Sequence, residues 1–149
     1  MTQVNAFKYA NEELLAQVNH LLAQLSSSAS TMSLTQLKDF LDSSAVTLFI
    51  ATDEGRTIGM LTLAMFPIPT GIRAWIEDVV VDSDARGRGA GELLTLTAVE
   101  HAKRHGAITV DLTSRPSREA ANRLYQKVGF VARETNVYRF FVESEPGLE

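Results

Sequence analysis

The 149-residue sequence contains no cysteine, which excludes disulfide bonds, thiolate metal sites and a cysteine nucleophile. No apolar run approaches the length needed to cross a membrane. Residues 1–15 also lack the basic region followed by an apolar region that marks a signal peptide. We therefore expect a cytoplasmic protein that makes no use of a membrane.

Charge of one sign is not in large excess. The 14 lysines and arginines stand against 18 aspartates and glutamates, and the resulting net charge of −4 argues against a nucleic-acid-binding surface. With 45% hydrophobic and 21% charged residues, the composition is that of an ordinary globular protein. The length predicts one domain over residues 1–149, with residues 143–149 as a frayed tail.

The apolar patterns predict a mixed α/β fold. Asn11 is placed to cap a first helix, and Ser33 with Gln36 forms a capping box for a second. Further helices are expected at 92–105 and 116–127, and strands at 4–9, 45–52, 57–66, 72–82 and 107–114. Residues 130–134 and 136–142 read as a closing hairpin that turns at 135–136. The order β-α-α-β-β-β-α-β-α-β-β indicates a mixed sheet with helices on its faces.

The stretch RGRGAG, residues 86–91, follows a predicted strand and precedes a predicted helix. Backbone N–H groups at a helix N-terminus form an anion cradle that the helix dipole reinforces. Glycines allow a phosphate to approach the backbone closely, and Arg86 and Arg88 would add charge-assisted hydrogen bonds. A pyrophosphate is the natural guest, while a plain strand-to-helix turn without a ligand is the alternative.

Two nucleotide-binding motifs fit this turn poorly. In the dinucleotide fingerprint GxGxxG the third glycine falls one residue later than Gly91 does here. A phosphate-binding P-loop needs Lys and Ser or Thr after its last glycine, but Glu92 and Leu93 follow. A dinucleotide-binding enzyme therefore stays only as a weaker alternative.

Two segments together carry a family resemblance. Arg86-x-x-Gly89-x-Gly91 resembles the R/Q-x-x-G-x-G/A signature of the GCN5-related N-acetyltransferase (GNAT) superfamily. About thirty residues later, Asn122-x-x-Tyr125 and the following Gly129-Phe130 look like that family's N-x-x-x-Y-x-x-x-G-F segment, with one residue fewer between Asn and Tyr. LTSRPSREAANRLY is similar to general bacterial members. The strand IEDVVV is also similar to that of glucosamine-6-phosphate N-acetyltransferases, whose sugar substrate is not carried over.

The resemblance covers about residues 45–140 and implies a GNAT-like acyl-CoA N-acyltransferase fold, with a central, mostly antiparallel twisted sheet flanked by helices. It implies an acetyl-CoA-dependent N-acetyltransferase (EC 2.3.1.-) in which a primary amine attacks the thioester directly in a ternary complex. Acetyl-CoA is then a cosubstrate, no metal is needed, and the acceptor is a small molecule or a protein amine. A homodimer fits the family, with terminal strands paired across its interface. A non-catalytic acyl-CoA-binding sensor or regulatory module is the alternative from another class.

By the same resemblance, Tyr125 is the general acid that protonates the leaving thiolate. The backbone near Val79 faces the thioester oxygen, and the strand around it pairs with the pantetheine arm. The coenzyme-binding residues implied are Val79, Val80, Val81, Arg86, Gly87, Arg88, Gly89, Ala90, Gly91 and Asn122.

The general base is chosen from two neighbouring carboxylates. Glu77 and Asp78 are neighbours on a strand, so strict alternation points them to opposite faces and groups Glu77 with Val79 and Val81. This grouping favours Glu77 as the base, acting directly or through water; otherwise it only binds a cationic amine.

Three further features have ordinary explanations as well as functional ones. His101 and His105 have a metal-pair spacing without a third ligand, which favours a solvated helix face. Arg115 and Arg118 would reach the coenzyme phosphates or remain surface charges. Trp75 would shape the acceptor pocket or pack.

Overall fold

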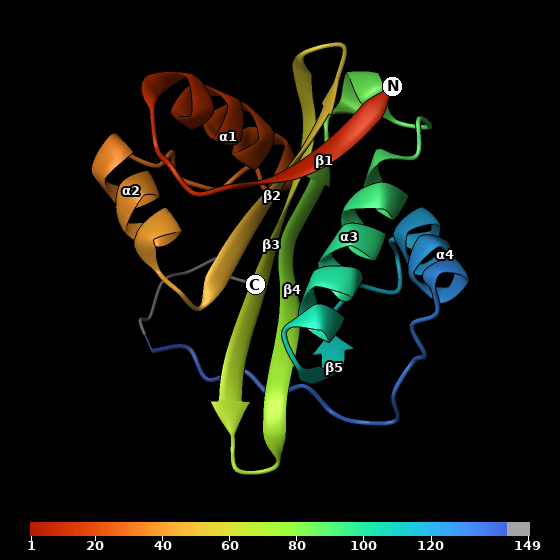
Figure 1. Cartoon of the computed structure of the whole chain (residues 1–149). Coiled ribbons are helices and arrows are strands. Elements are labelled where there is room, and N and C mark those ends of the chain that lie inside the picture. Colours follow the sequence, from red (N-terminus) through yellow and green to blue (C-terminus); the bar gives the residue numbers. More distant parts are fainter. Residues whose placement is uncertain (143–149) are drawn as a thin grey trace.

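A computed structural model shows a five-stranded sheet and four α-helices, and it describes residues 1–142. The strands lie side by side in chain order, antiparallel from β1 to β4, with β5 parallel to β4 (Figure 1). The mostly antiparallel mixed sheet is therefore confirmed. The strands are β1 (Thr2–Phe7), β2 (Val46–Asp53), β3 (Arg56–Ile68), β4 (Gly71–Val81) and β5 (Ala107–Asp111).

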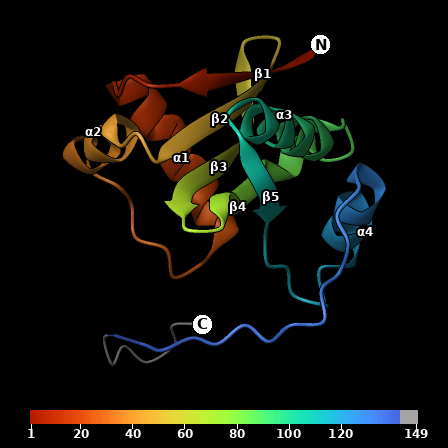
Figure 2. The same ribbon diagram turned by 60° about the horizontal axis from the view of Figure 1, so that its bottom comes forward.

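The helices cover the sheet from both sides. Helices α1 (Glu12–Leu25) and α2 (Leu34–Asp42) pack on one face, where a core cluster includes Leu21, Leu37 and Ile50. Helix α3 (Ala90–Arg104) packs on the other face, over a second cluster that includes Leu61 and Leu94. Helix α4 (Glu119–Val128) lies beside α3, as Figures 1 and 2 both show.

The predicted starts of α1 and α2 are confirmed in atomic detail. The Asn11 side chain accepts a hydrogen bond from the backbone N–H of Leu14 at 2.7 Å. Ser33 and Gln36 make both hydrogen bonds of a capping box. Such caps replace the hydrogen bonds that the first turn of a helix lacks, and they fix where α1 and α2 begin.

The predicted closing hairpin is wrong for the residues that the structure describes. Residues 130–142 contain no strand, so the chain has fewer strands than the expected order. The alternating apolar pattern favours an extended backbone, but a strand also needs a neighbouring strand to pair with. In the structure this segment runs away from the body of the molecule (Figure 2). The expected frayed tail, residues 143–149, lies outside the described part of the chain.

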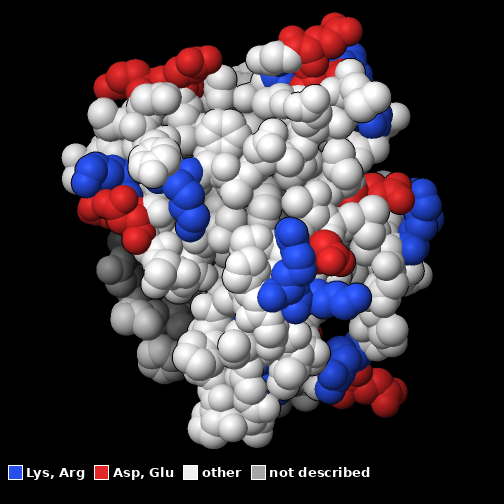
Figure 3. Space-filling view, in the orientation of Figure 1, with Lys and Arg blue, Asp and Glu red and all other residues white. Residues whose placement is uncertain are grey.

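The surface carries both signs of charge in small groups. Figure 3 shows basic and acidic side chains spread around a largely uncharged centre, with basic ones gathered over the C-terminal end of α3. Lys103 and Arg104 lie in the last turn of that helix, where the helix dipole favours cations. Within residues 1–142, no helix has both the length and the apolarity to span a membrane.

Candidate active site

Strands β4 and β5 separate halfway along β4. Their pairing runs from Ile72 with Ala107 to Trp75 with Asp111 and stops there. Strand β4 continues for six more residues, to Val81, without a β5 partner. Its backbone along this side is thus open to an extended ligand, at the point where the sequence places the coenzyme arm.

A β-bulge interrupts β4 inside this opening. Met60 of β3 pairs with Val80 and Thr62 pairs with Glu77, so Asp78 and Val79 together face one residue of β3. Asp78 has a φ of +52°, a left-handed conformation that is uncommon outside glycine. Bulges of this kind are over-represented next to active sites because they re-aim backbone and side chains.

The bulge overturns the expected alternation of side chains. Ile76, Val79 and Val81 all pack with the core under α3, although strict alternation separates Ile76 from the two valines. Glu77 therefore points away from Val79 and Val81, toward the face that α1 and α2 cover. The extra residue shifts the alternation by one position, which the sequence pattern alone does not reveal.

Glu77 is exposed and held by its neighbour on the same face. The indole N–H of Trp75 donates a hydrogen bond of 2.7 Å to Glu77 Oε1. Trp75 thus has a definite role as the partner of a candidate catalytic carboxylate. The hydrogen bond fixes one carboxylate oxygen and leaves the other free to accept a proton.

The glycine-rich loop depends on two left-handed residues. Gly87 has a φ of +82° and Gly89 a φ of +79°, a conformation that costs other residues free energy. Gly89 is the N-cap of α3 and offers no side-chain acceptor to the first turn. The backbone N–H groups that open α3 are therefore available to an anion, as the cradle hypothesis requires.

Gly91 lies where three elements meet. A Cβ atom on Gly91 would be 3.7 Å from Val81 of β4 and 3.7 Å from Leu124 of α4. The glycine loop, the open end of β4 and the helix that carries Tyr125 are thus brought together. The end of β4 and the glycine loop lie within residues 81–91, and the helix lies at residues 119–128. The fold makes these two distant segments neighbours.

The two arginines of the loop differ in their surroundings. Arg88 forms an ion pair with Asp53, at the β2–β3 turn, with 3.3 Å between the charged atoms. Arg86 is exposed and has no ion-pair partner among residues 1–142. Arg86 is therefore the arginine of the loop that could bind an anion without first breaking an ion pair.

Tyr125 is buried, with 7% of its surface exposed, and its ring packs edge-on against Phe130 at 5.9 Å. Burial raises the pKa of the phenol above its ordinary value, although nearby Arg118 opposes this. The hydroxyl therefore stays protonated at neutral pH, as a proton donor must.

Asn122, one turn before Tyr125, holds the loop that precedes α4. Its side-chain amide donates a hydrogen bond of 2.9 Å to the backbone carbonyl of Arg115. One of the two amide N–H groups is thereby occupied, so a contact to the coenzyme would use the amide oxygen or the second N–H. Arg118 forms the N-cap position of α4 without a side-chain capping bond.

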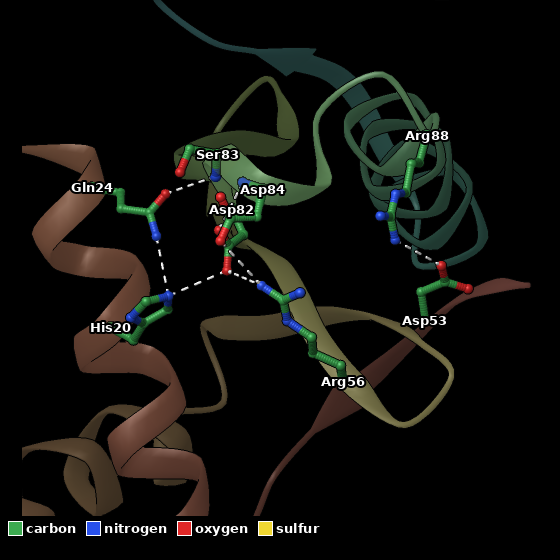
Figure 4. Close-up of polar contacts among 8 residues, drawn as sticks. All are labelled: His20, Gln24, Asp53, Arg56, Asp82, Ser83, Asp84 and Arg88. Carbon is green, nitrogen blue, oxygen red and sulfur yellow. Dashed lines mark hydrogen bonds and ion pairs between the residues drawn. The ribbon is translucent and has the colours of Figure 1, made fainter.

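A buried carboxylate that the sequence analysis missed anchors the start of the glycine loop. Asp82 is 2% exposed and accepts a hydrogen bond from the backbone N–H of Asp84, at the start of the 3₁₀ turn Ser83–Ala85 (Figure 4). Its other oxygen lies 3.2 Å from His20 of α1 and 3.2 Å from Arg56 of β3. Asp is a frequent N-cap residue, and its position directly after a strand is the one local sequence signal of this role.

This network keeps Asp82 ionised. The backbone N–H of Asp84 lowers the pKa of the Asp82 carboxyl most, while burial opposes it. Hydrogen bonds from His20, Gln24 and Arg56 lower that pKa further. Helix α1 also reaches the loop directly, because Gln24 accepts a hydrogen bond of 2.8 Å from the backbone N–H of Ser83 (Figure 4).

The histidine pair on α3 packs with its surroundings. His101 and His105 stack at 4.1 Å, and His101 lies edge-on to Phe49 at 5.4 Å. Burial lowers the pKa of His101, and the neighbouring His105 and Arg104 act in the same direction. No three potential metal-ligand side chains gather within residues 1–142.

Two surface cavities lie apart from this site. One, of about 300 Å³, is lined by His101, Phe66 and their neighbours at the far end of α3. The other, of about 290 Å³, lies between α1 and the β2–β3 turn and is lined by His20 and Arg56. Neither of these two cavities is lined by Tyr125, Glu77 or the glycine loop.

Comparison with known protein families identifies the family of this chain. The model of the acetyltransferase (GNAT) family matches residues 15–130. The chain belongs to this family, whose members use acetyl-CoA as a cosubstrate. The family resemblance of the sequence motifs is thereby confirmed.

Individual members of the GNAT family match parts of the chain. It is 36% identical over 90 residues to mycothiol acetyltransferase of Thermomonospora curvata, covering 60% of this chain and 29% of that protein. It is 39% identical over 66 residues to glucosamine 6-phosphate N-acetyltransferase 1 of Oryza sativa subsp. japonica, covering 44% of this chain and 38% of that protein. The chain thus spans less than half the length of these two relatives.

Among solved structures, a putative acetyltransferase from Agrobacterium tumefaciens superposes with a TM-score of 0.83 at 25% identity. The match covers 93% of this chain and 99% of that one. The GNAT fold is therefore shared over nearly the whole described chain.

Proposed function

We propose that this protein transfers the acetyl group of acetyl-CoA to a primary amine by direct attack in a ternary complex. The observation that carries the proposal is the convergence of three elements at Gly91. The anion cradle, the open edge of β4 and the helix bearing a buried, protonated tyrosine meet there. These are the parts that amine acetylation needs.

The coenzyme is held mainly by backbone. Its pyrophosphate lies on the N–H groups of residues 87–91 at the start of α3, and Arg86 supplies a free cation. The pantetheine arm runs along β4 beyond Trp75, where it takes the place that β5 has left. Val79 to Val81 line this path, with a backbone N–H near Val79 polarising the thioester carbonyl.

The chemical step needs one proton removed and one supplied. The amine nitrogen forms a bond to the carbonyl carbon, and the bond from that carbon to sulfur breaks. Glu77, directly or through a water molecule, takes the proton that the amine loses. Tyr125 gives its proton to the departing thiolate and regains one from solvent. Asn122 positions the loop before α4 and accepts a hydrogen bond from the coenzyme arm.

The acceptor is an amine of a small molecule or of a protein. The side of the sheet on which Glu77 and Trp75 lie, facing α1 and α2, is the side from which it approaches. The absence of a metal in the mechanism, the cytoplasmic location, the single domain and the homodimer stay predictions. Nucleic acid and membranes have no role in the proposal.

The first test is ligand-induced stabilisation. Acetyl-CoA, NAD and ATP are each added alone at about a hundred times the expected dissociation constant, which should stabilise the fold by about 2.7 kcal/mol for the true ligand. For a chain of this length the melting temperature rises by roughly 5–10 °C. We expect this only with acetyl-CoA. A shift with NAD alone would favour the dinucleotide-binding alternative.

Replacing Tyr125 with Phe tests the chemical step. General acid catalysis contributes about 10²–10⁴ to a rate, so turnover should fall by about that factor while acetyl-CoA still raises the melting temperature. Tyr9→Phe, a change at an exposed tyrosine, is the matched control. Because the protein has no cysteine, a thiol reagent reports released CoA without background.

The acceptor for this assay comes from a panel of polyamines, amino acids, aminoglycosides and lysine peptides. Unchanged turnover in Tyr125→Phe would remove this residue from the mechanism. Binding of acetyl-CoA without CoA release on any amine of the panel would favour the non-catalytic sensor.

A further inference from the structure

A cavity of about 300 Å³ lies at the C-terminal end of α3. It is bounded by the last turns of α3, the start of β2 and the β3–β4 hairpin, and its lining includes Thr47, Met65, Phe66, His101 and His105. Cavities that bind small molecules in proteins begin at about this volume. Because Tyr125, Glu77 and the glycine loop do not line it, this cavity is separate from the chemistry proposed above.

The rings that line the cavity give it a flat apolar wall. His101 and His105 stack with their ring centroids 4.1 Å apart and 21° between the ring planes. Phe66, which is 41% exposed, lines the cavity together with Met65 and Ile72. Flat rings pack well against such surfaces, in offset or edge-on contact. The cavity therefore fits a small molecule with an aromatic or similarly flat body.

The polar groups of the lining suit a ligand that accepts hydrogen bonds. Ser44 and Thr47 each contribute a hydroxyl group that can donate a hydrogen bond. His105 Nδ1 already donates a hydrogen bond of 2.7 Å to the backbone carbonyl of His101, which holds the outer ring of the stack in place. Among residues 1–142, no Asp or Glu lines the cavity.

Two cations without an acidic partner lie beside the cavity. The Lys8 ammonium donates a hydrogen bond of 3.2 Å to the backbone carbonyl of Val46, which lies between two residues of the lining. Arg104 lies in the last turn of α3, and Figure 3 shows basic side chains gathered over this end of the helix. In the described part of the chain, the ion pairs of side chains involve other cations. Lys8 and Arg104 are therefore available to an anion.

The electrostatic surroundings of His101 agree with this. Burial lowers the pKa of the His101 imidazole most, and the nearby His105, Arg104 and Lys8 lower it further. These three groups thus act on the ring as positive charges. In a chain with a net charge of −4, this is a local region of positive potential that favours an anion.

The dipole of α3 opposes an anion only weakly. The C-terminal end of a helix carries partial negative charge on its unsatisfied carbonyl groups. Here the backbone N–H of His105 donates to the carbonyls of His101 and Ala102 at 3.1 and 3.2 Å, and that of Gly106 donates to Lys103 at 3.2 Å. These last carbonyls are therefore satisfied within the chain, and the two cations offset the rest of the dipole.

We propose that this cavity binds a small carboxylic acid with a flat apolar body. The body packs against the stacked imidazoles and Phe66, and the carboxylate faces Lys8 and Arg104. The carboxylate supplies the partner that both cations lack, in charge-assisted contacts. This inference does not depend on acetyl transfer, because none of these residues belongs to the proposed catalytic site.

The chain has three histidines, so nuclear magnetic resonance can observe the cavity directly. Benzoate is the probe, added at constant ionic strength to protein with labelled histidine rings. The ring signals of His101 and His105 should move and saturate with a Kd of roughly 1 mM, as expected for so small a ligand. His20 lines the other cavity and is the internal reference, whose signals should stay in place. The absence of a shift at about 10 mM benzoate, or an equal shift of His20, would overturn the proposal.

Three related probes separate charge from shape. Benzamide and benzylamine keep the ring of benzoate but carry a neutral or a cationic group, and acetate keeps the carboxylate without the ring. Each should bind at least about tenfold more weakly than benzoate. Equal binding of benzamide or benzylamine would exclude selection by charge. Equal binding of acetate would exclude a role for the flat wall.

Variants locate the binding site. The double variant Lys8→Gln with Arg104→Gln should weaken benzoate binding by roughly fivefold to tenfold and leave benzamide binding unchanged. Lys127→Gln removes an exposed lysine that pairs with Glu92 in the first turn of α3, at the other end of the helix, and should change neither.

A steric variant tests the cavity itself. Ala45→Phe places a ring at an exposed position of the lining and should abolish the benzoate shifts. The melting temperature of each variant shows whether it is folded. Benzoate affinity equal to wild type in folded Ala45→Phe, or in the folded double variant, would place the binding site elsewhere and overturn the proposal.

Discussion

Two pairs of a carboxylate and an arginine flank the glycine loop, and they differ mainly in burial. Asp82 contacts Arg56 at 3.2 Å, and Asp53 contacts Arg88 at 3.3 Å (Figure 4). The Asp82 side chain is 2% exposed and that of Asp53 is 18% exposed, while both arginines are about half exposed.

The difference shows what fixes a loop. Asp82 is buried and also accepts a backbone N–H from Asp84 and a contact from α1, so it ties the chain itself in place. The pair of Asp53 and Arg88 joins two side chains over the surface, where solvent and salt screen it. We therefore expect the loop to depend on the first pair and to tolerate loss of the second.

The largest effect should come from Asp82→Asn. The amide keeps the shape of the side chain but loses the negative charge that attracts its hydrogen-bond donors. This loss should lower the free energy of unfolding by about 1–2 kcal/mol. The melting temperature at pH 7 should fall by roughly 3–6 °C. The control is Asp42→Asn, which breaks an exposed ion pair with Lys38 and should change the melting temperature little. Equal losses in the two variants would contradict a special role for Asp82.

The contribution of Asp82 should also depend on pH in a defined direction. The folded structure lowers the pKa of this carboxyl below its ordinary value of 3.8, so the charged form stabilises the fold. The contribution is complete at pH 5 and is lost as the pH falls below 3.8 toward the folded pKa. Urea midpoints of wild type and Asp82→Asn should thus converge below pH 3.8. A difference that widens there would reverse the assigned sign.

The sequence reveals the parts of the site that are local and hides those that are not. The glycine loop and the segment around Tyr125 each lie within ten residues, so their motifs predict them. The contacts of Asp82 join residues 62 and 26 positions apart, which no local pattern encodes. The bulge at Asp78 escaped prediction because a non-glycine residue occupies the left-handed position.

The fold shows the same division. Caps and apolar periodicity predict nine of its elements, because each signal lies inside the element that it defines. Residues 130–142 were predicted as a hairpin because their apolar pattern is that of strands. Whether such a pattern becomes a strand depends on a neighbouring edge, which is a property of the assembled sheet and not of the segment.

Two alanine variants separate the backbone role of the loop from its proposed ligand role. Gly89→Ala places a Cβ in open space but at a φ of +79°, which should cost about 1 kcal/mol of stability. Gly91 lies in α3 at an ordinary φ, so Gly91→Ala should leave stability unchanged or raise it slightly. Its methyl group should nevertheless weaken acetyl-CoA binding where a phosphate approaches the backbone. Calorimetry with and without acetyl-CoA distinguishes the two; equal stability of both variants would contradict the left-handed cap.

The smallest effect compares the two ion pairs most directly, because the same substitution is made on both sides of the loop. Arg56→Gln and Arg88→Gln each remove one cation that is 54% or 52% exposed. Arg56→Gln takes a donor from a buried carboxylate, so the urea midpoint should fall by a small but measurable amount. Arg88→Gln removes one exposed partner of Asp53, which keeps its ion pair with the Met1 amino group at 2.9 Å, and its midpoint should match wild type within error. Added salt should leave the Arg56→Gln difference largely in place, since the carboxylate end of that pair is buried. A larger loss in Arg88→Gln would mean that the surface pair, and not burial of Asp82, holds the loop.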